Sequence, residues 1–335
     1  MTEFLKALLQ TEIKPFLRDL APAGEMLLHA FAFFVFILIV GLFADWGRER
    51  LQACVEMRRP QSLKRIFCRF CSLMLKRPAV PDMAQKTLFV AAPLFAVVFA
   101  LFFFFFMPDG QINVYQDSSL LYFLFASSCG VYAFITGGWS SASRFSFFGA
   151  VRLIAQSLAC QLVLAVVVVT VLMTAGGSEL SFVMHAQEHL WFIVPHFPLF
   201  VLYLMASAMM LAQAPFGSPK STRELAGGVY AEYSGALLAL FLIAENILLL
   251  LCSVVASVLF LGGTQPLFGI DILPSVVWLG LKTVLVIFVL TLMRCALPSW
   301  RTDRIMHISF KMCLPFALIW LTMTAVVLSV VQGGA

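Results

Sequence analysis

Few side chains in this sequence could do chemistry at membrane depth, and Glu245 stands out among them. It is the only carboxylate well inside one of the long apolar stretches of the chain. A charged group in hydrocarbon is expensive, so an acid at this depth indicates a functional site. The alternative is a structural glutamate that forms hydrogen bonds with neighbouring helices.

Two other patterns have the spacing of metal ligands, but neither predicts a metal centre. Cys68 and Cys71 form a C-x-x-C pair in a basic segment, and no second pair accompanies them. A structural zinc site needs four ligands. His185, Glu188 and His189 have helical spacing, and we expect them on a solvated helix in a loop. We therefore expect this chain to bind neither a metal ion nor an iron–sulfur cluster.

The elements that must position Glu245 follow from composition. Hydrophobic residues make up 61% of the 335 residues and charged residues only 12%, about half the charged share of a soluble domain. A helix that crosses about 30 Å of hydrocarbon needs about 20 apolar residues. The stretches that approach this length are 27–44, 88–107, 119–137, 150–174, 191–211, 236–262, 275–293 and 308–331. We predict an all-α, polytopic membrane protein with about eight transmembrane helices.

We expect one transmembrane domain over residues 27–331, preceded by a separate segment, residues 1–26. This segment carries acids as well as bases and no clean cleavage site, so it does not have the pattern of a signal peptide. Its apolar residues could share one face of an interfacial helix. A simple first anchor leading into the first span explains the segment equally well.

Positive charges are distributed unevenly between the loops. Residues 45–87 hold ten Lys and Arg residues, whereas 108–118, 175–190 and 263–274 hold none. Basic loops stay on the cytoplasmic or matrix side of a membrane. The loops predicted on that side are 45–87, 138–149, 212–235 and 294–307. This side also has the longest loops, so we expect function and partners there.

Three segments on the basic side carry family-like patterns. The first, residues 137–159, reads GGWSSASRFSFFGAVRLIAQSLA; the second, 215–235, reads PFGSPKSTRELAGGVYAEYSG; the third, 294–315, reads RCALPSWRTDRIMHISFKMCLP. In this order and on this side, they resemble the quinone-site membrane subunit of respiratory complex I, the proton-translocating NADH dehydrogenase. The resemblance covers roughly residues 45–330.

The resemblance implies a substrate, partners and site residues. It implies ubiquinone or another quinone as substrate, entering from lipid, and bound structural phospholipids. Its partners would be the peripheral-arm quinone-site and iron–sulfur subunits, small neighbouring membrane subunits and lipid, with no nucleic acid. Candidates for the quinone chamber and its loops are Trp139, Ser140, Ser141, Arg144, Arg152, Pro215, Phe216, Glu224, Tyr233, Arg294, Arg301 and Asp303. Candidates for a proton path are Glu224, Glu232, Glu245 and Lys282.

The sequence also departs from the family pattern by losing acids. Gln161 stands where the family typically has Glu, and Arg69 stands where an Asp would align. The family's acidic Pro-Phe-Asp-Leu-Pro-Glu loop is changed at Gly217, Ser218, Lys220 and Thr222, and an earlier carboxylate is replaced by apolar residues near Met210. Glutamine cannot release a proton at the pH of a cell. The loss of these acids changes the electric field on the quinone and any proton route through the subunit.

Two alternatives remain open from the sequence. One is the equivalent subunit of a membrane-bound hydrogenase, which would copurify with a nickel-containing subunit. The other is a free-standing transporter, which would need broken helices at the membrane midplane. The Phe-rich composition, with 34 Phe, favours the mitochondrial inner membrane, with a bacterial plasma membrane as runner-up.

Overall fold

The computed structural model describes residues 37–102, 119–188, 190–213, 215–217, 227–266 and 274–333. Within these ranges every regular element is a helix, which confirms the all-α prediction. The predicted N-terminal segment, residues 1–26, lies outside the described residues.

The first described helix covers residues 37–55. After it come α3 (Leu63–Leu75), α4 (Lys86–Phe102), α5 (Ser119–Ser140), α6 (Arg144–Ala175), α7 (Leu180–His185), α8 (Phe197–Met210), the 3-10 turn η4 (Gly228–Tyr230), α10 (Gly235–Phe260), α11 (Ser275–Ala296), α12 (Thr302–Ile308), the π-helical turn η6 (Ser309–Cys313) and α13 (Leu314–Gly333).

Five helical stretches in the described residues are long and apolar enough to cross a membrane, so the chain is a polytopic membrane protein. They are α5, α6, α10, α11 and the continuous stretch Thr302–Val330. Two further predicted spans, α4 and α8, are apolar but shorter. The span predicted over 191–211 begins its helix only at Phe197, where a proline occupies the first turn.

Local sequence explains where several of these helices begin and end. Ser143 caps α6, because its hydroxyl accepts a hydrogen bond from the backbone N–H of Ser146. The same helix ends at Gly176, whose positive φ of 77° gives a left-handed cap. Pro315, in the first turn of α13, cannot donate a backbone hydrogen bond, and the π-helical turn η6 ends two residues before it, at Cys313.

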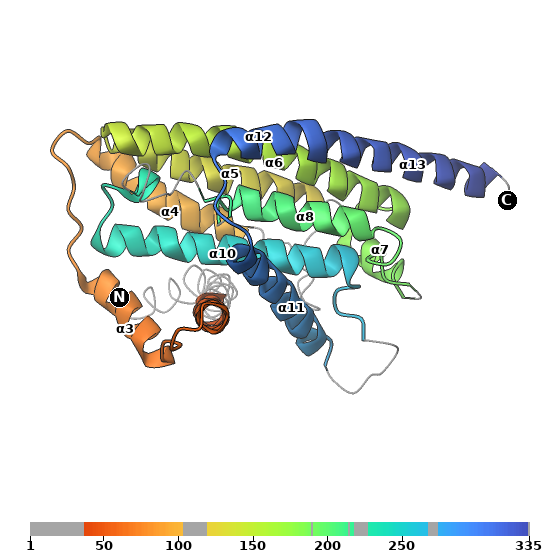
Figure 1. Cartoon of the computed structure of the whole chain (residues 1–335), viewed down its shortest axis with the longest axis horizontal. Coiled ribbons are helices and arrows are strands. Elements are labelled where there is room, and N and C mark those ends of the chain that lie inside the picture. Colours follow the sequence, from red (N-terminus) through yellow and green to blue (C-terminus); the bar gives the residue numbers. More distant parts are fainter. Residues whose placement is uncertain are drawn as a thin grey trace, which may run out of the picture.

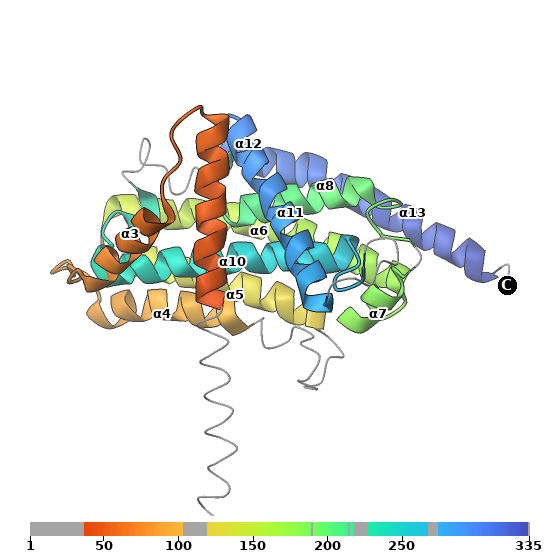
Figure 2. The same ribbon diagram turned by 90° about the horizontal axis from the view of Figure 1, so that it is seen from below.

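The helices form a bundle in which α4, α5, α6, α8 and α10 run roughly along one axis (Figure 1). The helix over residues 37–55 crosses α10, and α11 is tilted across the bundle on the same face (Figure 2). The starts of α4, α6 and α10 and the end of α5 lie at one end of the bundle (Figure 1). These ends adjoin the basic loops 45–87, 138–149 and 212–235.

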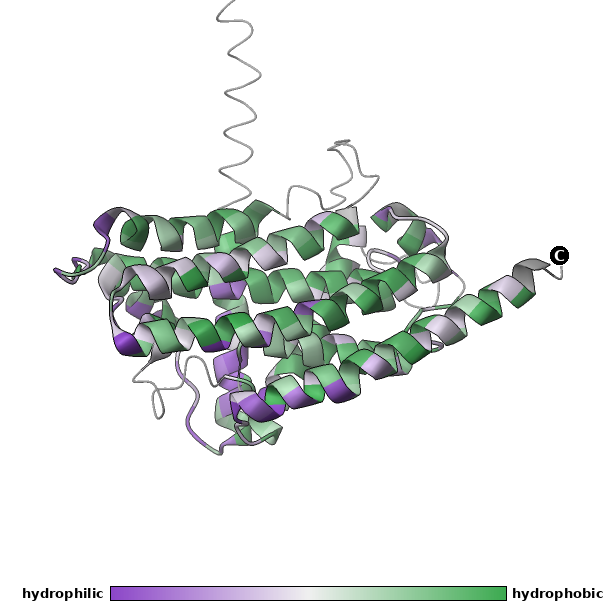
Figure 3. Ribbon diagram, turned by 90° about the horizontal axis from the view of Figure 1, so that it is seen from above, coloured by the Kyte–Doolittle hydropathy of each residue, from purple (hydrophilic) through white to green (hydrophobic). Residues whose placement is uncertain are grey.

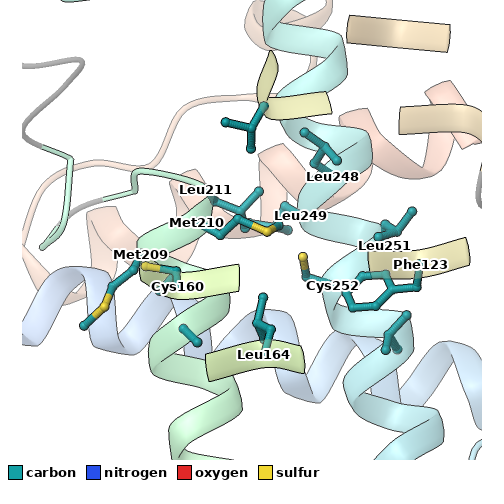
Figure 4. Close-up of a cluster of buried hydrophobic side chains, with 14 of the residues drawn as sticks. Phe123, Cys160, Leu164, Met209, Met210, Leu211, Leu248, Leu249, Leu251 and Cys252 are labelled. Carbon is teal, nitrogen blue, oxygen red and sulfur yellow. The ribbon is translucent and has the colours of Figure 1, made fainter. Parts of the chain in front are cut away.

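The core lies where α5, α6, α8 and α10 meet. Side chains from these helices, including Leu164, Met209 and Cys252, interdigitate in a cluster that is almost fully buried (Figure 4). By contrast, α13 leaves large apolar side chains such as Ile319 and Val330 exposed. The outer helices are hydrophobic along most of their length (Figure 3). Lipid is the environment in which such a surface is stable.

Candidate functional site

The three family-like segments meet at Phe216. The phenyl ring of Phe216 is fully buried and packs edge-on against Trp300, with ring centroids 5.6 Å apart. Gln156 of α6 donates from Nε2 to the carbonyl oxygens of Met209 (2.6 Å) and Phe216 (2.9 Å). The backbone N–H of Trp300 donates to the carbonyl of Pro215 at 2.9 Å. Residues from all three segments therefore form one packed unit at the basic end of the bundle.

Glycines allow the segment 227–235 to approach this unit closely. A Cβ on Gly149 would lie 2.8 Å from Gly228 Cα, and one on Gly137 would lie 2.8 Å from the ring of Phe241. The hydroxyl of Tyr233 reaches the carbonyl oxygens of Phe89 and Gly137, both at 3.2 Å. Its ring stacks on Phe89 at 4.1 Å. Gly137 and Gly149 of the first segment therefore allow close packing of the backbone.

A cavity of about 530 Å³ opens beside this unit. Its walls come from the helix over residues 37–55, α3, the start of α10, the end of α8 and Arg294 at the end of α11. Ile66, Phe70 and Leu73 of α3 give it an apolar side. The volume falls in the range of about 300–1,000 Å³ that is usual for small-molecule sites.

Six charged side chains line this cavity, three acids and three arginines: Asp45, Arg48, Glu49, Arg69, Glu245 and Arg294. Glu49 and Arg69 form an ion pair at 3.6 Å. Arg69 is a departure from the family pattern, and Glu49 of the same chain balances its positive charge. An apolar wall together with converging charges suits a ligand that has a polar head and an apolar tail.

Glu245 accepts a hydrogen bond from the hydroxyl of Tyr230. Tyr230 lies in the loop before α10 and packs against the rings of Phe134 and Phe241. Burial, and then the neighbouring charge of Glu245, raise the pKa of Tyr230 well above its usual value. Tyr230 therefore stays protonated and acts as a donor to the carboxylate at the cavity wall.

Asp45, Arg48 and Asn246 form a second polar group in the wall. Arg48 donates from Nη2 to Asp45 Oδ1 and to Asn246 Oδ1, the latter at 2.6 Å. Asn246 donates from Nδ2 to the other oxygen of Asp45. The group joins the helix over residues 37–55 to α10, next to Glu245 in sequence.

Of the candidates from the first segment, none lines the cavity. Trp139 is 73% exposed, and Arg144 at the start of α6 is also exposed. Ser140 and Ser141 are buried, and their hydroxyls donate to the carbonyls of Gly137 (3.0 Å) and Gly138 (2.8 Å). Arg152 is half-buried on α6.

The other candidates divide between the cavity and the packed unit beside it. Arg294 and Glu245 line the cavity. Pro215, Phe216 and Tyr233 are buried in the packed unit, and burial raises the pKa of Tyr233 to about 12. Arg301 and Asp303 are exposed at the start of α12, and Glu232 is half-buried in the loop before α10. Glu224, Lys220 and Thr222 lie outside the described residues.

Lys282 lies away from the cavity, at the other end of α11 from Arg294. Its amino group is buried and donates to the carbonyls of Gly263 (3.0 Å) and Gln265 (2.6 Å). The ammonium also lies 4.8 Å from the centroid of the Trp191 ring, a favourable cation–π distance. These contacts join α11 to the turn after α10.

The metal-like patterns also have definite places. Cys68 and Cys71 are both on α3, and neither forms a disulfide. His185 and Glu188 form an exposed pair at 2.7 Å at the end of α7, while His189 is outside the described residues. In the described parts of the chain no group of three or more potential ligands could hold a metal ion.

Sequence reasoning missed most of the cavity wall, including Asp45, Arg48, Glu49, Tyr230 and Asn246. In the sequence Arg48 contributes only to the charge of a basic loop, although Asp45, Arg48, Glu49 and Gln52 recur at helical spacing directly after the first apolar stretch. A helix that continues past residue 44 places all four on one side. This helical periodicity is the feature of the sequence that could have identified these cavity residues.

The fold and the cavity define a class: a multi-spanning helical membrane protein with a charged cavity at the basic ends of its helices. Comparisons with known proteins then place the chain within this class. The sequence model of the NADH dehydrogenase family matches residues 28–325. The chain belongs to this family, in the branch that comprises the H subunits of NADH-quinone oxidoreductases and chain 1 of NADH-ubiquinone oxidoreductases.

Three relatives illustrate the similarity. The NADH-quinone oxidoreductase H subunit of Paramagnetospirillum magneticum is 34% identical over 303 residues, covering 88% of this chain and 89% of the relative. The corresponding protein of Rhodospirillum centenum is 32% identical, covering 92% and 95%. Chain 1 of the NADH-ubiquinone oxidoreductase of Chondrus crispus is 30% identical, covering 85% and 90%. The predicted family is confirmed.

Proposed function

We propose that this chain is the membrane subunit of a complex I in which quinone passes from lipid through the cavity toward the peripheral arm. The observation that carries the proposal is the cavity itself, which combines an apolar wall from α3 with six charged side chains. A quinone has an isoprenoid tail that suits the apolar wall and two carbonyl oxygens that can accept hydrogen bonds from arginines.

We further propose that Glu245 couples quinone reduction to proton translocation. Its carboxylate lies at the cavity wall and accepts a hydrogen bond from Tyr230. Reduction of a quinone to a quinol takes up two protons, so an acid beside the site can deliver or sense them. Glu224, Glu232 and Lys282 complete the set of residues proposed for the proton path.

The remaining parts of the proposal concern topology and assembly. About eight transmembrane helices carry the basic loops to the matrix or cytoplasmic side, where peripheral-arm subunits dock. The membrane is the mitochondrial inner membrane, or a bacterial plasma membrane in a bacterial host. The similarity to H subunits and chain 1 of NADH-quinone oxidoreductases favours this assembly over the membrane-bound hydrogenase left open by the sequence.

The test of the proposed function uses the assembled complex with Glu232→Gln or Glu245→Gln in this chain. We expect lower quinone reductase activity or fewer protons moved per electron in the Glu245 variant. Glu188→Gln is the matched control, because Glu188 is an exposed acid near α7, far from the cavity. Wild-type activity and wild-type proton stoichiometry in both site variants would refute the assignment.

A further inference from the structure

The polar group formed by Asp45, Arg48 and Asn246 is a closed ring of interactions. Arg48 Nη2 contacts both Asp45 Oδ1 and Asn246 Oδ1, and Asn246 Nδ2 contacts Asp45 Oδ2. The amide oxygen of Asn246 therefore accepts a hydrogen bond from the Arg48 guanidinium, and its NH2 group donates one to the Asp45 carboxylate. A carboxamide carries its acceptor and its donor side by side in one plane, which suits this double contact.

The ring lies where two helices cross. A Cβ on Gly41 would lie 3.8 Å from Asn246 Cβ and 3.7 Å from Leu250, so the backbone of the helix over residues 37–55 passes close to α10 there. Arg48 is only 9% exposed. A buried guanidinium is stable only when its charge and its donors are paired. Asp45 supplies the charge, and Asn246 fixes the pair to α10.

Two of the five N–H donors of Arg48, both on Nη2, contact Asp45 and Asn246. Its Nε is enclosed by protein atoms. The donors left for a ligand are those of Nη1, on a side chain that lines the cavity. Arg294 and Glu245 lie close enough to act on the charge of Arg48, and both also line the cavity. A guanidinium donor without a protein partner at a cavity wall is available to an acceptor that occupies the cavity.

We infer that Asn246 is a positioning residue for the quinone reaction: it holds Arg48 so that the guanidinium Nη1 donates to a carbonyl oxygen of the quinone. This inference rests on the proposed function and adds a specific contact to it. Asn246 touches Asp45 and Arg48, and its effect on the quinone passes through Arg48.

The test compares purified complexes that carry Asn246→Leu, Asp45→Asn, Asn246→Asp or the double change D45N/N246D. Asn246→Leu keeps the branched shape of the side chain and removes both polar contacts. The double variant exchanges the carboxylate and the amide between the two helices, so net charge and both partners of Arg48 are kept. Gln187→Leu is the control, since Gln187 is a buried amide that donates to the carbonyls of Val183 and Val258 at the other end of the bundle.

We expect Asn246→Leu to raise the KM for a short-chain quinone about tenfold, because losing a hydrogen bond to a charged group has roughly this effect. The kcat should change less. Each single exchange should also raise KM, and the double variant should recover most of the loss. Gln187→Leu should leave KM unchanged even if it lowers the yield of complex. A merely structural role of Asn246 would lower yield without a selective rise in KM or a rescue.

Arg48→Leu separates failure of this inference from failure of the proposed function. If Arg48→Leu raises KM but Asn246→Leu does not, or if D45N/N246D is no better than the worse single variant, the positioning role is overturned. If neither Arg48→Leu nor Asn246→Leu changes KM in assembled complexes, the quinone does not bind at this cavity wall, and the proposed function falls with the inference.

Discussion

Replacing Gly149 by alanine should disturb the site from a distance. Gly149 lies on α6, and a Cβ there would lie 2.8 Å from Gly228 Cα and from the backbone nitrogen of Val229. Both neighbours are backbone atoms, so they cannot rotate away as a side chain would. The turn η4 would have to move from 2.8 Å to the ordinary contact distance of 3.4 Å, a shift of about 0.6 Å.

The matched control is Gly280→Ala, because Gly280 is also inside a helix and a Cβ added to it would have no neighbouring atom within 4 Å. Both changes replace a helical glycine by alanine and gain the same helix propensity. The difference between the unfolding free energies of the two variants therefore isolates the steric cost. Overpacking of this kind costs about 1–3 kcal/mol, and we expect Gly149→Ala to be less stable than Gly280→Ala by that amount.

The assay is unfolding of the full chain in mixed micelles, with SDS as the denaturant and circular dichroism as the signal. The shift of η4 also moves Tyr230, which donates to Glu245. Gly149→Ala should therefore lower quinone reductase activity in assembled complexes, whereas Gly280→Ala should not. Equal stability and equal activity of the two variants would refute the packing argument.

Single contacts give three further predictions. Phe216→Ala should destabilise the chain by about 3–5 kcal/mol in the same SDS titration, because a buried ring packed on Trp300 is lost; the exposed ring of Phe288 provides the control variant Phe288→Ala. Tyr230→Phe should lower quinone reductase activity without loss of assembly, since only the hydroxyl bound to Glu245 is removed; unchanged turnover would exclude a role for this hydrogen bond. Arg69→Ala should cost at most about 1 kcal/mol, because its ion pair with Glu49 is partly exposed; a larger loss would mean that the pair is a main support of the cavity.

The fold class could be predicted from the sequence because hydropathy and loop charge are local properties. Stretches such as 236–262 and 275–293 correspond closely to α10 and α11. The short α8 was harder to delimit, since Pro198 in its first turn, rather than hydropathy, determines where the helix begins. Helix boundaries depend on such capping details, whereas the existence of a long apolar helix does not.

The candidate site was predictable only in part, because family-like motifs contain packing residues as well as ligand contacts. Ser140 and Ser141 bond to their own helix, and Phe216 joins three segments. The partners of Glu245, by contrast, come from tertiary structure: Tyr230 folds back over α10 from the preceding loop. Asp45 and Arg48 meet Asn246 across about 200 positions of sequence, and no local pattern predicts such a pairing.

The central claim is that a quinone occupies the cavity between the helix over residues 37–55, α3 and α10. Photolabelling of the intact complex with a short-chain quinone that carries a photoreactive tail, followed by peptide mapping, tests it most directly. We predict labels on the cavity residues of α3, such as Phe70 and Leu73, and loss of these labels with excess unmodified quinone. Labels confined to exposed apolar residues of α13, such as Ile319 and Val330, would contradict the claim.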